Sequence, residues 1–373
     1  MPHLQHIMEA LNRIAPWDLA ESWDNVGLQI GRLDQPVSRV MVALDLNEQV
    51  IREGLHCQVD GFVVHHPLLF KPLSKVNLDT PIGRCLEELI KHRLFLIAAH
   101  TNMDMAAGGL NQFLAERFEL TDIKLLDPCM SPSSQRSYKI VVFAPQEYIP
   151  VLRKVMVRAG AGVIGNYSDC SFEVGGSGTF QPCNQATPFI GKPGEVSRIE
   201  ETRLEMLVSE GNLSKVSAAV HDNHPYEESV IDVYPVQSPV IHGMGRIGRL
   251  KEPLKLCDLA LLAKKKLSAK DIRITGEQDK MIHTLAICSG SGGSLLNKVL
   301  RSKVDAFLTG ELNYHDFLMS KDSDLAVIVA GHWATEHGFV DLMVRHFNDY
   351  FRNTSDCEFI PSTTLQDEPF ITL

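Results

Sequence analysis

Apolar and polar residues along this chain follow two different periods, one typical of buried strands and one typical of amphipathic helices. Short apolar runs predict strands at 61–65, 94–99 and 325–330. Elsewhere, apolar residues recur at spacings of three and four, which predicts helices at 81–92 and 332–351. Strands that alternate with helices in this way form parallel sheets with helical crossovers. The pattern therefore predicts an α/β fold.

The same alternation extends through the rest of the first and last thirds of the chain. Further strands are expected at 37–44, 284–288 and 306–309, and further helices at 4–15, 49–57, 109–117 and 294–301. We interpret residues 1–130 and 241–373 as two α/β halves of one core.

Residues 131–240 show a different order of elements. The polar segment Ser131-Pro-Ser-Ser-Gln135 marks a boundary. Strands are expected at 138–144, 170–180, 203–208 and 230–234, and helices at 147–159 and 214–221. This order, β-α-β-β-α-β, predicts an inserted ferredoxin-like α+β domain. Such a domain could cover a site in the core, bind a ligand of its own, or act only in assembly.

One polar segment of the inserted region could carry chemistry. His224-Pro-Tyr-Glu-Glu228 places His224 and Glu227 where they could reach a ligand. A proline-containing turn explains the same residues equally simply, so both interpretations stay open.

Histidines and carboxylates directly follow three of the predicted strands. In chain order they are His65 and His66, then His100 and Asp104, then His332 and Glu336. If these strands lie side by side in one parallel sheet, their carboxyl ends converge on one pocket. His332 and Glu336 lie one helical turn apart, a chelating geometry that in isolation more often forms a surface hydrogen bond or salt bridge. Because buried charge must be paired or bound to metal, the clustering predicts a metal site.

The donor types indicate which kind of metal site this is. Five donors that include no thiolate are more than one structural zinc ion needs. They are His65, His66, Asp104, His332 and Glu336. Mixed nitrogen and oxygen donors suit two divalent ions that share a carboxylate and keep positions open for water, a catalytic arrangement. Zinc, iron and manganese all accept such ligands.

Five segments of the chain together resemble the NIF-three-like family, whose members are often catalogued as homologues of a type 2 GTP cyclohydrolase I. The segments are Asp24-Asn-Val-Gly-Leu-Gln-Ile-Gly31, His65-His-Pro67, His100-Thr-Asn-Met-Asp104, Thr309-Gly-Glu311 with His315, and Gly331-His-Trp-Ala-Thr-Glu336. The resemblance implies a NIF-three-like three-layer core made of the two α/β halves. It also implies a PII-like or CutA-like inserted domain, which a subset of the family carries, and a toroidal homohexamer.

The resemblance further implies a role for each candidate ligand. His66 and Asp104 would bind one ion, His65 and His332 the other, and Glu336 would bridge both. Glu311 and His315 follow another strand end. We interpret these two residues, together with His100, as groups that orient ligands or transfer protons.

A glycine-rich loop at 290–294 offers a further candidate site. Gly290-Ser-Gly-Gly-Ser294 lies between a predicted strand and a predicted helix, so its amides could bind a phosphate that faces the metals. It lacks the lysine of a P-loop and the spacing of a dinucleotide fingerprint. A tight connector is the alternative interpretation.

Composition excludes several classes of partner. A net charge of −10 without long Lys/Arg runs argues against a nucleic-acid surface. No apolar stretch of membrane-spanning length and no amino-terminal signal pattern is present, so no membrane association is expected. The eight cysteines are scattered and form no CxxC pair, which is typical of reduced thiols in a cytoplasmic protein.

Two functions of different classes follow from these features. The first is a di-metal hydrolase, GTP cyclohydrolase by the resemblance, in which a metal-bound hydroxide attacks a nucleotide or phosphorylated substrate. The alternative is a non-enzymatic, metal-binding homo-oligomeric assembly that binds a small metabolite or a partner through the inserted domain.

Overall fold

The computed structural model describes residues 2–129, 137–164, 167–236, 241–352, 357–364 and 368–371. Contacts divide the chain into two compact units. The first contains Met1–Ser131 and Val240–Leu373, and the second contains Pro132–Pro239. In the parts that the structure describes, no helix is long and apolar enough to cross a bilayer.

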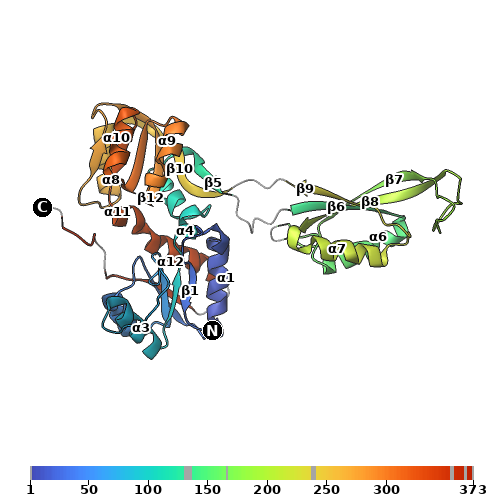
Figure 1. The fold of residues 1–373 in the computed structure, drawn as a ribbon, viewed down its shortest axis with the longest axis horizontal. Helices are drawn as coiled ribbons and strands as arrows, with labels where there is room; N and C mark the ends of the chain where they lie inside the picture. Colours follow the sequence, from blue (N-terminus) through green and yellow to red (C-terminus); the bar gives the residue numbers. More distant parts are fainter. Residues whose placement is uncertain are drawn as a thin grey trace. The chain divides into compact units, whose positions relative to one another are not determined.

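A five-stranded sheet forms the amino-terminal part of the first unit (Figure 1). Its strand order is β1 (Gly27–Ile30), β4 (Phe95–Ala98), β3 (Gly61–Val64), β2 (Arg39–Ala43) and β15 (Glu358–Pro361). The last four strands are parallel neighbours, whereas β1 pairs antiparallel with β4. The sequence pattern missed β1, because four residues next to a loop carry too little periodicity to distinguish a strand.

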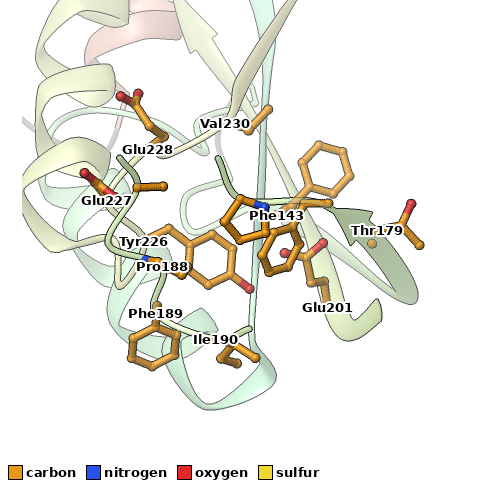
Figure 2. A pocket seen from close by; sticks show the side chains of 14 residues that line it. Phe143, Thr179, Pro188, Phe189, Ile190, Glu201, Tyr226, Glu227, Glu228 and Val230 are labelled. Atoms are coloured by element: carbon orange, nitrogen blue, oxygen red, sulfur yellow. The ribbon is translucent and has the colours of Figure 1, made fainter. Parts of the chain in front are cut away.

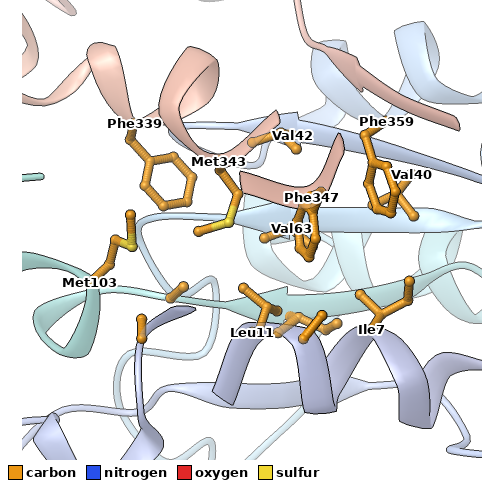
Figure 3. Packing of buried hydrophobic residues seen from close by; sticks show 14 of the residues in the cluster. Ile7, Leu11, Val40, Val42, Val63, Met103, Phe339, Met343, Phe347 and Phe359 are labelled. Carbon is orange, nitrogen blue, oxygen red and sulfur yellow. The ribbon is translucent and has the colours of Figure 1, made fainter. Parts of the chain in front are cut away.

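Helices cover both faces of this sheet, because alternate strand residues face opposite sides. Val40, Val42 and Val63 pack against α1 (Leu4–Ile14) and α12 (Gly338–Phe351), as Figure 3 shows. The intervening residues Met41, Phe62 and Val64 pack with residues of α2 (Glu48–His56) and α3 (Pro81–Lys91) on the other face. Strands buried on both sides account for the uninterrupted apolar runs in the sequence.

A six-stranded sheet forms the other part of the first unit. Its order is β11 (Arg273–Thr275), β14 (Ala326–Val329), β13 (Ala306–Glu311), β12 (Met281–Ser291), β10 (His242–Lys255) and β5 (Thr121–Cys129). Strands β12, β13 and β14 are parallel. The helices of this part are α5 (Leu110–Arg117), α8 (Leu256–Lys266), α9 (Leu296–Ser302) and α10 (Tyr314–Asp322). The three histidine-bearing strands do not share one sheet, which was the condition considered for their convergence, since β14 lies here and β3 and β4 lie in the five-stranded sheet.

The helix predicted at 332–351 is two helices separated by one residue. They are α11 (His332–Glu336) and α12, with His337 between them. The ring of His337 bonds to the carbonyl of Leu267 at 3.2 Å. A Cβ on Gly338 would lie 2.4 Å from the ring of Phe113. The close approach of other elements therefore sets this junction, and periodicity along the chain cannot show such an approach.

The chain passes from the first unit to the second after β5 and returns at β10, and these two strands are neighbours in the six-stranded sheet. Cys129 at the end of β5 is paired with His242 at the start of β10 in an antiparallel ladder. The unit consists of β6 (Ser137–Ala144), α6 (Ile149–Arg158), β7 (Ser171–Phe180), β8 (Ser197–Ser209), α7 (Glu210–Asn223) and β9 (Ile231–Val236). Its antiparallel sheet has the order β7-β8-β6-β9. One face packs on the helices through Ile140, Leu152, Leu204 and Val216.

Candidate metal centre

The five candidate ligands come from the carboxyl ends of strands in both sheets of the first unit. His65 and His66 follow β3, and Asp104 lies in α4 (Thr101–Met105), which follows β4. His332 and Glu336 lie at the two ends of α11, which follows β14. The structure brings all five together in overlapping groups whose donor atoms lie within 4.8 Å of one another.

The distances arrange these donors into two groups that share Glu336. His65 Nε2 lies 3.8 Å from Asp104 Oδ2 and 3.8 Å from Glu336 Oε1. The other carboxylate oxygen, Glu336 Oε2, lies 2.9 Å from His66 Nε2 and 3.1 Å from His332 Nε2. The structure thus pairs His65 with Asp104 and His66 with His332. The pairing implied by the resemblance, His66 with Asp104 and His65 with His332, differs from this geometry.

Each of the three histidines is oriented by a hydrogen bond at its Nδ1 atom. The partners are the Ala99 carbonyl for His65 at 2.8 Å, Asp45 for His66 at 2.8 Å, and Glu311 for His332 at 3.1 Å. An imidazole that donates from Nδ1 keeps the lone pair of Nε2 for a metal. All three Nε2 atoms face the carboxylates, so the protein prepares the tautomer that a metal requires.

The two carboxylates are buried and closely held. Ser289 donates from Oγ to Asp104 Oδ1 at 2.7 Å. Gly290 passes so close to Glu336 that a Cβ there would lie 2.2 Å from Oε1, and its φ of +56° also disfavours a side chain. Two buried atoms in this centre, His65 Nε2 and Glu336 Oε2, make no hydrogen bond to any described residue.

Burial and mutual contact shift the pKa values of these groups in opposite directions. Burial raises the pKa of Asp104. Burial also acts to raise the pKa of Glu336, but the close imidazoles of His332, His65 and His66 hold it well below its ordinary value. Burial favours neutral His66, yet its contacts with Asp45 and Glu336 raise its pKa to about 10. Metal binding at these groups therefore competes with proton binding.

The centre fits a divalent metal ion. Its nitrogen and oxygen donors are those that zinc, iron and manganese accept. A buried imidazole nitrogen and a buried carboxylate oxygen without hydrogen bonds would be costly unless a cation satisfied them. The buried His/Asp/Glu cluster could thus hold a metal.

His100, expected among the orienting residues, lies at the edge of the cluster. A donor atom of His100 lies within 4.8 Å of donor atoms of His65 and His66. Its Nδ1 contacts Asp24 at 2.9 Å. Burial opposes ionisation of Asp24, but its hydrogen bonds with His100 and Thr101 lower its pKa to about 2. Asp24 is therefore an ionised acceptor that orients this imidazole.

The two remaining candidates for orienting residues, Glu311 and His315, differ in their contacts with the centre. Glu311 follows β13 and contacts His332 Nδ1, as expected for a residue that orients a ligand. His315 is exposed in α10 and stacks edge-on beside Tyr314. No contact described for His315 joins it to the metal centre.

Comparison with known proteins identifies the family. The model of the Duf34/NIF3 (NGG1p interacting factor 3) family matches residues 2–368. The chain belongs to this family. A Bacillus subtilis protein named "GTP cyclohydrolase 1 type 2 homolog" is 38% identical over 331 residues, which are 88% of each chain. A relative of the same name from Mycobacterium tuberculosis is 37% identical over 337 residues, 89% of this chain and 88% of its own.

A solved structure extends the match to the whole fold. The crystal structure of a Bacillus cereus protein related to NIF3 is 32% identical to the chain. It covers 100% of this chain and 99% of its own, with a TM-score of 0.80. The expected NIF-three-like family and its mixed α/β fold with several sheets are therefore confirmed.

Sequence reasoning missed several residues of this NIF3-family centre. Asp45 follows β2, so the rule that found the ligands, a polar side chain directly after a buried strand, would also have found it. Ser289 and Asn111 gave no such signal. The side-chain oxygen of Asn111 accepts the Ser289 N–H at 2.9 Å, and its amide donates to the Asp104 carbonyl at 3.1 Å. Small polar residues of this kind are recognised only when the elements that carry them meet.

The glycine-rich loop at 290–294 does not have the environment of an anion site. A neighbouring cavity of about 580 Å³ is lined by Ser291, Gly293 and Ser294, but also by the carboxylates of Glu311 and Asp316. Arg273 is the cation among its lining residues. The helix after the loop, α9, has seven residues. The connector interpretation fits this environment better, with Gly290 required for its approach to Glu336.

Proposed function

We propose that this NIF3-family protein is a hydrolase that depends on two divalent metal ions and acts on a nucleotide or phosphorylated small molecule. The observation that carries the proposal is the division of the donors into two groups that share Glu336. The name of the Bacillus subtilis relative makes GTP the first substrate to test.

His65 and Asp104 would hold one ion, His66 and His332 the other, and Glu336 would contact both. When bound, two divalent ions would lower the pKa of water, neutralise phosphate charge and polarise the reacting group. Zinc, iron and manganese are the candidates. The surrounding side chains exclude bulk water from one side of the centre, because His65 is fully buried.

The exposed side of the centre indicates where a substrate would enter. The side chains of His66 and His332 are 26% and 35% exposed, whereas those of Asp104 and Glu336 are 8% and 4% exposed. His100 lies beside His65 and His66, and Asp24 fixes its Nδ1 so that Nε2 stays available. We assign it the role of moving a proton to or from the reacting group.

Two aromatic side chains beside His100 support a substrate with a planar base. Trp23 and Phe70 are 58% and 42% exposed, unusually open for large rings. Their ring centroids lie 6.1 and 6.3 Å from that of His100. A nucleobase could stack on such rings, since stacking on aromatic side chains is favourable for every base.

The test is turnover of GTP by protein loaded separately with zinc, iron and manganese, followed by formate release and phosphate release. We expect activity that needs metal, disappears with a chelator and is lost in His66→Ala. The control variant His315→Ala replaces an exposed histidine outside the centre and should retain the activity. Full metal loading with no turnover of GTP or other nucleotides and phosphate esters would contradict the proposal.

The alternative function is a metal-binding assembly without catalysis that recognises a metabolite through the second unit. The observation that favours it is a cavity of about 410 Å³ formed wholly by residues of that unit. We propose that this unit is a ferredoxin-like domain of the PII or CutA kind, which its element order supports. A homohexamer in the cytoplasm remains our prediction, to be tested by light scattering and cell fractionation.

A further inference from the structure

We propose that the second unit contains a binding site of its own for a small organic cation with an apolar body, such as an aryl-alkyl ammonium compound. The inference does not depend on metal binding or on hydrolysis. It rests on a cavity, on the charge of its walls, and on a carboxylate in it that no cation of the described residues pairs with.

The cavity has the size and character of a small-molecule site. Its volume of about 410 Å³ lies within the range of roughly 300–1,000 Å³ typical of such sites. Four aromatic side chains line the cavity, and Figure 2 labels three of them. The four are Phe143 at the end of β6, Phe180 at the end of β7, Phe189 between β7 and β8, and Tyr226 before β9.

The charge of the lining selects a cation. Glu201, Glu227 and Glu228 line the cavity, and no Lys, Arg or His is among its described lining residues. The faces of aromatic rings attract cations, most strongly where water is excluded. Arg203 lies on the ring of Phe143 but pairs with Glu205 at 2.9 Å, and it does not line the cavity. An anionic ligand would meet three carboxylates here and no cationic side chain among the described lining residues.

Two polar groups of the cavity, the Glu201 carboxylate and the Tyr226 hydroxyl, lie close to each other. Among the described residues, no cation pairs with the Glu201 carboxylate. A Cβ on Gly178 would lie 2.2 Å from Glu201 Oε2, so this glycine leaves the space that the carboxylate occupies. The Tyr226 hydroxyl is buried, and the polar side chain close to it is Glu201. Burial, together with Glu201, raises the pKa of Tyr226. A ligand ammonium group could satisfy Glu201 directly, with the hydroxyl beside it.

The turn that supplies Tyr226 is held in place before any ligand arrives. His224 Nε2 donates to the Phe143 carbonyl at 3.0 Å, and its Nδ1 accepts the Tyr226 N–H at 3.1 Å. Glu227 accepts the N–H of Thr187 at 2.8 Å and so joins the turn to the segment that carries Phe189. The segment 224–228 is therefore both a turn and part of a site. A cavity fixed in this way loses little entropy on binding.

The test compares three probes with one apolar body and different charge: phenethylamine, 2-phenylethanol and phenylacetate. Binding to the full-length protein at pH 7 is measured by calorimetry and by the shifts of methyl and aromatic NMR signals. We expect phenethylamine to bind about tenfold more tightly than the alcohol. Phenylacetate should not bind. Equal binding of the amine and the acetate, or no binding of the amine at all, would overturn the proposal.

Matched variants locate the site. Glu201→Gln should weaken phenethylamine binding about tenfold, because it removes the charge and keeps the size. Glu205→Gln, on the same strand and face but outside the cavity, should bind like wild type. Glu201→Asp serves as the second variant, and it should retain part of the affinity. Unfolding curves show whether each variant folds. A folded Glu201→Gln protein with wild-type affinity would contradict the assignment.

Discussion

At the scale of single residues, the metal centre depends on one carboxylate whose two oxygens face different partners. Glu336 Oε1 faces His65, and Oε2 faces His66 and His332. A group in that position affects both sides of the centre, whereas each histidine affects one. Variants can therefore distinguish the shared donor from the donors of one side.

Replacing Glu336 with Gln removes the charge that both ions would share and keeps its size. We expect the occupancy of both ions to fall together, whereas His332→Ala should mainly empty the site shared with His66, and Asp104→Ala the site shared with His65. Elemental analysis of the purified variants measures metal per chain. Wild-type metal content in Glu336→Gln would contradict the shared role.

Glu311→Gln tests a residue that orients a ligand without being one. The change weakens the hydrogen bond that fixes His332 Nδ1, so metal affinity should fall about tenfold while the fold is kept. The matched control is His315→Ala, from a neighbouring exposed position without a described contact to the centre. A competitive chelator titration gives both affinities. Equal affinities in the two variants would show that Glu311 does not orient His332.

At the scale of elements, short connections next to strands carry the polar residues of both units. In the first unit these are the short segments after β3, β4 and β14. In the second unit it is the turn between α7 and β9. That turn depends on one neutral histidine, because Nδ1 of His224 can accept the Tyr226 N–H only while it carries no proton.

The local stability of this turn should therefore depend on pH. Burial lowers the pKa of His224 below its ordinary value of 6.5. Between the lowered pKa and 6.5 the unfolded turn binds more protons than the folded turn. The contribution of neutral His224 to the stability of the turn is therefore complete above pH 6.5 and is lost as the pH falls through this window. The hydrogen-exchange protection factor of the Tyr226 amide should fall between pH 7.5 and 5. The Met206 amide, in the β6–β8 ladder, is the control.

If the protection factor of Tyr226 stays constant over this range while that of Met206 also stays constant, His224 does not hold the turn. A parallel loss at both amides would instead indicate that the whole unit loses stability. Only a selective loss at Tyr226 agrees with the hydrogen bond in the structure.

At the scale of the whole molecule, the second unit is inserted into the sequence of the first between β5 and β10, which pair with each other. Cys129 and His242 are partners in the ladder of β5 and β10, so a short turn can join them directly. The candidate ligands and the residues that orient them all lie in the first unit. The insertion is thus separable in sequence from the metal centre.

Deleting residues 130–241 and joining Cys129 to His242 with a short Gly/Ser turn should leave a folded protein that binds metal. We expect metal per chain equal to that of the full-length protein, and complete loss of phenethylamine binding. Elemental analysis and calorimetry measure the two properties. An insoluble or metal-free product would show that the insertion is part of the core.

The sequence by itself determined the alternation of strands and helices, because periodicity and apolar runs are local properties. It also determined which side chains come together, since residues such as His65 and His332 directly follow buried strands. Only the tertiary structure decided that these strands belong to two sheets, that His65 pairs with Asp104, and that Ser289 and Gly290 contact the carboxylates. Such contacts join segments far apart in the chain, and their distances depend on how the sheets pack rather than on any local pattern.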